Sequence, residues 1–238
     1  LDTLSKHVSI TVPVLLALWV RYVVQALATS AVMLPLRGRS LLRTRRPGMQ
    51  LLRGALLFAC SVLAFFSLKY LPVAEFTAMF MVTPILVTVV AARLLGERVS
   101  ALRWVFVVGG FVGVLVIARP GWRETHWSQL LPLMLIGTNT AFQLLTSRLA
   151  RTENAGTLHF YTGWVCTALG ALAVPFVWQP IADAWLWGAM IVMGTLGAIG
   201  HFLLVLAFAR APASVLMPYQ YLQIAFAMIG AALVALVL

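Results

Sequence analysis

The sequence predicts an all-α, polytopic membrane protein. Of its 238 residues, 62% are hydrophobic and only 10% are charged, and the mean hydropathy is +0.99. A helix needs about 20 apolar residues to cross a hydrocarbon core of about 30 Å. Apolar stretches of suitable length lie near residues 13–36, 51–70, 73–92, 103–119, 129–147, 156–178, 185–208 and 212–238. These eight spans leave almost no sequence for a soluble domain.

The basic residues lie almost entirely in the short loops between these spans, and they are unevenly distributed. If the spans alternate in direction, twelve arginines fall on one side, namely Arg37, Arg39, Arg43, Arg45, Arg46, Arg53, Arg93, Arg98, Arg103, Arg148, Arg151 and Arg210. The other side carries Lys6, Lys69, Arg119 and Arg123. Because lysine and arginine accumulate in cytoplasmic loops, we expect a cytoplasmic (inner) membrane protein with its arginine-rich loops in the cytoplasm. The net charge of +11 then reflects topology, and no nucleic-acid partner is expected.

Both ends of the sequence have the composition of interrupted spans. Residues 1–9 resemble the tail of an earlier helix, and the sequence stops within the apolar run LVALVL. We therefore expect one further helix at each end. Cys60 and Cys166 lie within apolar spans, where cysteine commonly serves as a small packing residue. We expect no disulfide, no metal and no cofactor.

The third and eighth spans can be aligned with an offset of 140 residues, which places residues 67–92 over residues 207–232. In each segment a short polar turn is followed by a proline, Pro72 or Pro212, and then by a long apolar helix. The eighth span comes five positions after the third, an odd number, so the two segments have opposite orientations, as in the inverted repeats of secondary transporters. Coincidence of composition is the alternative, because two apolar helices align easily.

Longer runs carry a resemblance to a known family. In the first half they are LKYLPVAEFTAMFMVTPILVTVVAARLLGERVS (68–100) and GGFVGVLVIARPG (109–121), and in the second half GHFLLVLAFARAPASVLMPYQYLQIAFAMIGA (200–231). These runs resemble the two repeats of the EamA-type transporters of the drug/metabolite transporter (DMT) superfamily. One departure is that the pair Gly96-Glu97 has no counterpart at Leu236-Val237.

The resemblance implies ten helices in two inverted five-helix repeats, with both termini cytoplasmic and alternating access to a central cavity. Residues 1–119 would form the first repeat, without most of its first helix, and residues 128–238 the second repeat, without its last helix. In such carriers the binding site lies near the membrane midplane, between the repeats.

Polar side chains within the spans are candidates for such a site, because a polar group in hydrocarbon needs a partner or a wet cavity. Asn139 and Gln143 lie one turn apart on one face of the fifth span, where they could hydrogen-bond either a solute or a neighbouring helix. Tyr219 and Gln223 have the same spacing in the last span, after a proline that would kink the helix. Thr83 directly precedes a proline in the matching helix of the first half.

Ionisable and aromatic residues complete the candidate set. Arg21 lies within a span, where it could bind a substrate carboxylate, pair with Glu75, or extend its side chain to the membrane interface. Glu75 lies in the first turn of a helix, where the helix dipole alone favours a carboxylate, and proton coupling is its alternative role. His201 lies mid-span among small residues and is a candidate for both cavity lining and proton coupling. Trp164 could stack on a substrate.

These observations predict a secondary transporter, not driven by ATP, of a small organic solute such as an amino acid or related metabolite. It would work by alternating access, with export favoured over uptake. The sequence contains no HExxH motif and no glycine-rich phosphate loop before a lysine, so no catalytic residue is assigned. An intramembrane enzyme or a non-transporting structural membrane protein is the alternative. The expected partners are the lipid bilayer and a small-molecule substrate, and the protein would be a monomer or homodimer.

Overall fold

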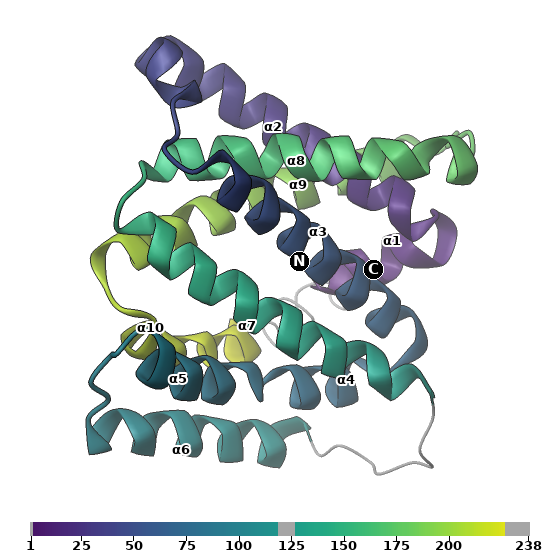
Figure 1. Ribbon diagram of the computed structural model, residues 1–238. Helices are drawn as coiled ribbons and strands as arrows, with labels where there is room; N and C mark the ends of the chain where they lie inside the picture. The colour runs from purple at the N-terminus through teal and green to yellow at the C-terminus, as the bar shows by residue number, and fades with distance from the viewer. Residues whose placement is uncertain (1, 119–126, 227–238) are drawn as a thin grey trace.

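The computed structural model describes residues 2–118 and 127–226, and these residues form helices without any strand. The α-helices are α1 (Asp2–Thr11), α2 (Val14–Arg37), α3 (Pro47–Tyr70), α4 (Val73–Phe80), α5 (Thr83–Leu94), α6 (Ala101–Ala118), α7 (Leu130–Ala150), α8 (Ala155–Val177), α9 (Ala184–Arg210) and α10 (Ala213–Gln220). Two short 3-10 helices, η1 (Gly38–Leu42) and η2 (Trp127–Gln129), precede α3 and α7. Figure 1 shows their arrangement.

The helices have the length and composition that a membrane protein requires. Six segments are long and apolar enough to span a bilayer, namely Val14–Leu42, Pro47–Tyr70, Val73–Leu94, Trp127–Ala150, Ala155–Val177 and Ala184–Arg210. The expected span at 103–119 corresponds to α6, and the last part of the expected span at 212–238 lies outside the described residues. The chain is an all-α, polytopic membrane protein, as the sequence predicts.

The connections that carry most of the arginines meet at one end of the bundle, on the left of Figure 1. The backbone N–H of Arg45, between α2 and α3, donates to the carboxylate of Glu153, between α7 and α8, at 2.9 Å. Glu97, between α5 and α6, contacts Arg151 and the start of α10. We call this the arginine-rich end. Its arginines are Arg37, Arg39, Arg43, Arg45, Arg46, Arg93, Arg98, Arg103, Arg148, Arg151 and Arg210.

The described connections between α1 and α2, between α3 and α4 and between α8 and α9 lie at the opposite end of the helices. The side chain of Gln179, between α8 and α9, donates to the carbonyl of Thr11, at the end of α1, at 2.9 Å. Gln129, before α7, donates to the carboxylate of Glu75, in the first turn of α4, at 3.1 Å. Arg119 and Arg123, which the sequence assigns to this end, lie outside the described residues.

One arginine that the sequence assigned to the loops lies elsewhere, and that assignment is wrong. Arg53 lies in the second turn of α3, and its side chain is only 1% exposed. Its Nε donates to the hydroxyl of Thr146 of α7 at 2.8 Å, and its Nη1 donates to the carbonyl of Leu158 and the hydroxyl of Thr162, both of α8. Arg53 is the third residue of the expected span at 51–70 and lies in the second turn of α3, so it faces neighbouring helices and not a loop.

The expected span at 73–92 is interrupted rather than continuous. Helix α4 ends at Phe80, and α5 begins at Thr83 after a turn at residues 81–82. Pro84 has no backbone N–H, so it cannot donate to the carbonyl of Phe80 as a regular helix would require. The proline therefore accounts for a local break in the helical hydrogen bonding, while Val73–Leu94 remains one apolar segment long enough to span a membrane.

Helices α4 and α10 correspond at the offset of 140 residues. Each contains eight residues, each follows a proline N-cap, and each is interrupted after its eighth residue. The two interruptions touch, because the hydroxyl of Tyr221 donates to the backbone carbonyl of Met81 at 3.2 Å. The two segments therefore share the same local structure, and the inverted repeat stays a prediction.

Helix α2 packs closely along α8 and α9, and glycines on those two helices permit the approach. A Cβ atom at Gly163 of α8 would lie 3.2 Å from the Cα atom of Ala26, and one at Gly194 of α9 would lie 2.7 Å from the Cβ atom of Val24. The distance at Gly194 is too short for a side chain, and the distance at Gly163 would require the Ala26 backbone to shift. The close packing holds the middle of α2, including Arg21, against α9.

Candidate functional site

A cavity of about 250 Å³ lies among α1, α2, α3, α4, α7 and α9. Along α3 its lining runs from Leu57 to Leu68, in the part of the helix remote from the arginine-rich end. On α7 it includes Leu135 and Asn139, in the first half of that helix. The cavity thus lies toward the opposite end of the bundle. Its lining residues are Ser5, Arg21, Leu57, Cys60, Ser61, Ala64, Phe65, Leu68, Phe76, Phe80, Leu135, Asn139, His201 and Gln223.

Arg21 is the charged residue of the cavity wall. Its side chain is 7% exposed, and its guanidinium lies against Gly197 of α9, where a Cβ atom would come within 3.0 Å of the Arg21 Nε atom. That Nε atom has no hydrogen-bond partner. The described residues provide no carboxylate in an ion pair with Arg21, since their ion pair joins Glu97 to Arg151. The guanidinium carbon lies 5.6 Å from the centre of the Tyr22 ring. Within the described residues this charge therefore has an aromatic neighbour but no carboxylate partner.

Amide side chains connect the cavity to α10. Asn139, in the cavity wall, accepts a hydrogen bond from the Nε2 atom of Gln143 at 2.6 Å. Gln143 is 3% exposed, and its Oε1 atom accepts a hydrogen bond from Gln220 of α10 at 2.8 Å. Gln143 thus lies behind Asn139 and does not line this cavity, while Gln223, beyond the end of α10, does.

Aromatic rings form the apolar part of the site. The rings of Phe76 and Phe80 on α4 are nearly parallel, with an interplanar angle of 4° and centroids 5.9 Å apart. His201 packs edge-on against Phe142 at 6.0 Å between centroids and also lines the cavity. The wall therefore combines a cation, neutral polar groups and flat apolar surfaces.

Of the residues predicted from the sequence, Arg21, Asn139, His201 and Gln223 come together at the cavity. Three others lie away from it. Trp164 donates from its ring N–H to the hydroxyl of Ser30 at 3.1 Å, and Tyr219 is 66% exposed. Thr83 is fully buried beside the interruption between α4 and α5.

Glu75 also lies outside the cavity lining. It occupies the first turn of α4, at the end of the bundle opposite the arginine-rich end, and accepts a hydrogen bond from Gln129. The described part of the chain contains no group of three or more His, Cys, Asp or Glu side chains placed to hold a metal ion.

The sequence analysis missed the contribution of α3 to the site. Cys60, interpreted as a packing residue, lines the cavity together with Ser61, whose hydroxyl is hydrogen-bonded to the hydroxyl of Tyr22. The signal was present as a helical stripe, since Leu57, Cys60, Ala64 and Leu68 recur every three or four residues. Its small and weakly polar residues leave space, but they carry no charge that would draw attention to them.

Comparisons with known proteins agree with this architecture. Residues 2–119 match the EamA-like transporter family. The chain is 28% identical over 207 residues to an S-adenosylmethionine uptake transporter of Rickettsia prowazekii (strain Madrid E), covering 85% of this chain and 70% of the relative. It is 27% identical over 219 residues to a riboflavin transporter of Brucella anthropi, covering 89% of this chain and 75% of the relative.

A solved crystal structure shares the fold. It superimposes with a TM-score of 0.71 at 20% sequence identity, covering 92% of this chain and 80% of the other. The family match and the relatives confirm the prediction of a transporter rather than an enzyme. The protein is an EamA-type member of the drug/metabolite transporter superfamily.

Proposed function

We propose that this transporter binds a small metabolite through an anionic group, such as a carboxylate, at Arg21, and carries it across the membrane by alternating access. The observation that carries the proposal is the buried guanidinium of Arg21, which faces the cavity without a carboxylate partner among the described residues. A charge buried within a membrane protein is costly unless it is paired or serves a pathway. A substrate anion would supply the missing partner.

Arginine is suited to this role because its planar guanidinium can form two parallel hydrogen bonds to one carboxylate. The backbone around Arg21 is fixed, since a Cβ atom at Gly194 would lie 2.9 Å from the Arg21 carbonyl oxygen. The side chain therefore extends from a rigid position. Rigid placement reduces the cost of ordering the site when a solute binds.

The remaining wall suggests what the rest of the solute looks like. Asn139 and Gln223 offer neutral amides, and the parallel rings of Phe76 and Phe80 offer a flat apolar surface. A solute with one anionic group, a few neutral polar groups and an apolar or ring portion fits this combination. Amino acids and their derivatives have this chemistry.

Orientation, direction and coupling form part of the same proposal. We place the arginine-rich end in the cytoplasm, because arginine favours cytoplasmic loops. The prediction of export stays open to test, and the relative named as an uptake transporter favours the opposite direction. His201 in the cavity wall is the better placed of the two candidates for proton coupling, since Glu75 does not line the cavity.

The test is transport by the full-length protein in reconstituted vesicles, with and without a proton gradient. The solutes are labelled amino acids, S-adenosylmethionine and riboflavin, measured in both directions. Saturable transport that Arg21→Gln abolishes supports the proposal. The matched control is Arg148→Gln, which removes the same charge from an exposed position at the arginine-rich end and should leave transport unchanged. Equal transport by the Arg21→Gln and unmodified proteins would overturn the role of Arg21, and no transport of any solute would overturn the proposed substrate class.

A further inference from the structure

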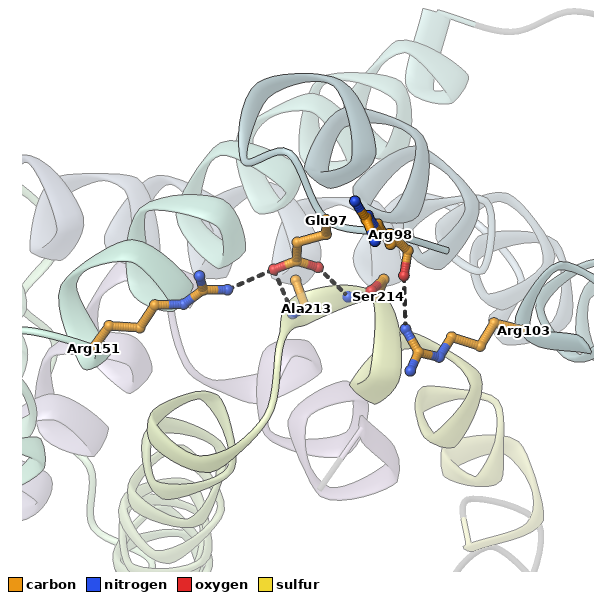
Figure 2. A network of polar contacts seen from close by, with 6 residues as sticks. All are labelled: Glu97, Arg98, Arg103, Arg151, Ala213 and Ser214. Carbon is orange, nitrogen blue, oxygen red and sulfur yellow. Dashed lines mark hydrogen bonds and ion pairs between the residues drawn. The ribbon is translucent and has the colours of Figure 1, made fainter. Parts of the chain in front are cut away.

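The arginine-rich end is closed by a carboxylate that joins both halves of the chain. Figure 2 shows Glu97, in the connection between α5 and α6, with Arg151 on one side and the start of α10 on the other. Its Oε1 atom accepts hydrogen bonds from Arg151 Nη2 at 2.7 Å and from the backbone N–H of Ala213 at 3.2 Å. Its Oε2 atom accepts one from the backbone N–H of Ser214 at 2.9 Å.

These contacts supply what α10 lacks in its own sequence. The N-cap of α10 is Pro212, which makes no side-chain capping bond, and the first turn contains no acidic residue. A carboxylate at a helix N-terminus satisfies free N–H groups and interacts favourably with the helix dipole. Glu97 therefore acts as the cap of a helix 116 residues further along the chain.

The backbone turn before Glu97 and the burial of its side chain favour this contact. Gly96 has a φ of +64°, a left-handed conformation that glycine adopts without strain, and this turn ends α5 directly before Glu97. The Glu97 side chain is 5% exposed, whereas the Arg151 side chain is 47% exposed. The carboxylate is buried against α10, and the arginine covers it from the water side.

Helix α10 connects the Glu97 contacts with the residues behind the cavity wall. This helix is held to the first half of the chain at its start by Glu97 and just beyond its end by the bond from Tyr221 to Met81. Between these points Gln220 pairs with Gln143, behind the cavity wall. The cavity lies toward the opposite end of the bundle, so the cavity and the Glu97 contacts occupy opposite ends of the structure.

We propose that Glu97, with Arg151 and the backbone of Ala213 and Ser214, is a cytoplasmic latch. The inference rests on the proposed alternating access. While the latch is closed, it holds the arginine-rich end shut and the cavity faces the other side. When the arginine-rich end opens, the carboxylate and the freed N–H groups exchange their mutual bonds for water, which is available at this loop because Arg151 is already half exposed. A permanent structural cap would instead remain bonded in both states.

The test measures access to two thiols and needs no solute. The chain has two cysteines, Cys60 and Cys166. In a Cys166→Ala background, Cys60 reports access to the cavity. In a chain with both cysteines replaced by alanine, Ser214→Cys reports access to the latch. Ser214 has a buried hydroxyl without a partner, and the change keeps the backbone N–H that Glu97 binds. A membrane-impermeant methanethiosulfonate is added to either side of vesicles of known orientation.

Glu97→Gln should raise labelling at position 214 from the arginine-rich side about tenfold, because losing about 1.4 kcal/mol of charge-assisted bonding shifts an equilibrium tenfold. Labelling of Cys60 from the opposite side should fall. The matched control is Glu153→Gln, which removes an acid at the same end whose bond, from the N–H of Arg45, does not involve α10. This control should leave both labelling rates unchanged.

Two results would overturn the latch. Unchanged rates in folded Glu97→Gln protein would show that the contact does not control access, and faster labelling of both thiols together would show general loosening. The outcome is separable from that of the proposed function. Reciprocal labelling with no Arg21-dependent transport supports the latch and refutes the substrate assignment, whereas Arg21-dependent transport with unchanged labelling does the reverse.

Discussion

Arg21 and Arg53 are buried arginines in consecutive spans, and their surroundings differ in the number of partners. Arg53 is 1% exposed, and it donates hydrogen bonds to Thr146, Leu158 and Thr162 from two neighbouring helices. Its guanidinium carbon also lies 5.1 Å from the centre of the Phe142 ring. Arg21 is 7% exposed and lines the cavity, and its guanidinium carbon lies 5.6 Å from the centre of the Tyr22 ring, but its Nε atom has no hydrogen-bond partner. Burial alone therefore does not separate a structural charge from a functional one.

The difference lies in where each charge obtains its stabilisation. The donors of Arg53 are satisfied by protein groups on α7 and α8, so this residue ties three helices together near the arginine-rich end. Arg21 lies in a packed helix but faces open space. A buried polar group without partners lowers stability, and proteins retain such groups where function requires them. We therefore expect substitution of the two arginines to affect different properties.

The largest effect should come from Arg21→Leu. We expect kcat/KM for transport to fall by about 100-fold or more, which corresponds to about 2.7 kcal/mol of lost binding energy, because the carboxylate of the solute would enter an apolar wall. The free energy of unfolding in mixed micelles should stay the same or rise, since an uncompensated charge is removed. Arg21→Lys should restore part of the transport, because it keeps the charge and loses the two-bond geometry. Transport at the unmodified rate by both the lysine and the leucine variants would contradict this role.

Arg53→Leu should show the converse pattern. Removing the guanidinium deletes its bonds to Thr146 and to α8, and hydrogen bonds to charged groups contribute about 1.5–3 kcal/mol each. We expect the free energy of unfolding to fall by about 3 kcal/mol, with solute affinity unchanged in the molecules that remain folded. Thermal unfolding and solute binding measured on the same sample would separate the two. A loss of affinity at full stability would place Arg53 in the transport pathway instead.

A smaller effect, on the free energy of unfolding, is expected from a substitution where the two interrupted helices meet. A Cβ atom at Gly110 of α6 would lie 2.4 Å from Cδ2 of the Tyr221 ring, whereas Gly109 has no described atom within 4 Å of such a position. Gly110→Ala must displace the ring and with it the bond to Met81, at a cost of about 1–3 kcal/mol. Gly109→Ala is the matched control and should be neutral or slightly stabilising. Equal stability of the two variants in thermal unfolding would show that the ring moves without cost.

Several parts of the fold follow from the sequence, and the reasons are physical. Apolar length predicts the spans, and the loop arginines predict that the connections at one end belong together. The offset of 140 residues predicts that α4 and α10 correspond. Contacts between residues far apart in the sequence do not follow from such local patterns. Nothing near Arg53 in the sequence indicates that Thr146 and Thr162 will face it, so it was counted with the loop arginines.

The lining of the candidate cavity could be predicted where a residue carries an ionisable group or an amide into a span. Arg21, Asn139, His201 and Gln223 were found in this way. The sequence does not show which face of a helix meets the cavity, so Trp164, which bonds to Ser30 on α2, was also a candidate. The sequence does not single out Cys60 either, because a small side chain lines a cavity only through the space that it leaves empty.

The smallest expected effect is at Gln143, which tests whether a buried amide that is hydrogen-bonded to other side chains acts only through those bonds. It lies one layer behind the cavity, accepts a hydrogen bond from Gln220 and donates one to Asn139. Gln143→Leu would leave Asn139 without this donor while keeping the side-chain volume. Since hydrogen bonds between membrane helices contribute about 0.6–2 kcal/mol, we expect the apparent solute affinity to fall about fivefold, by the conversion of about 1 kcal/mol. Gln220→Leu should cost about as much, and the double variant should cost less than the sum, because both changes break the same pair. Additive losses would mean that each glutamine contacts the solute by itself. Gln143 would then be a solute-binding residue, as proposed for Arg21, and not a structural residue like Arg53.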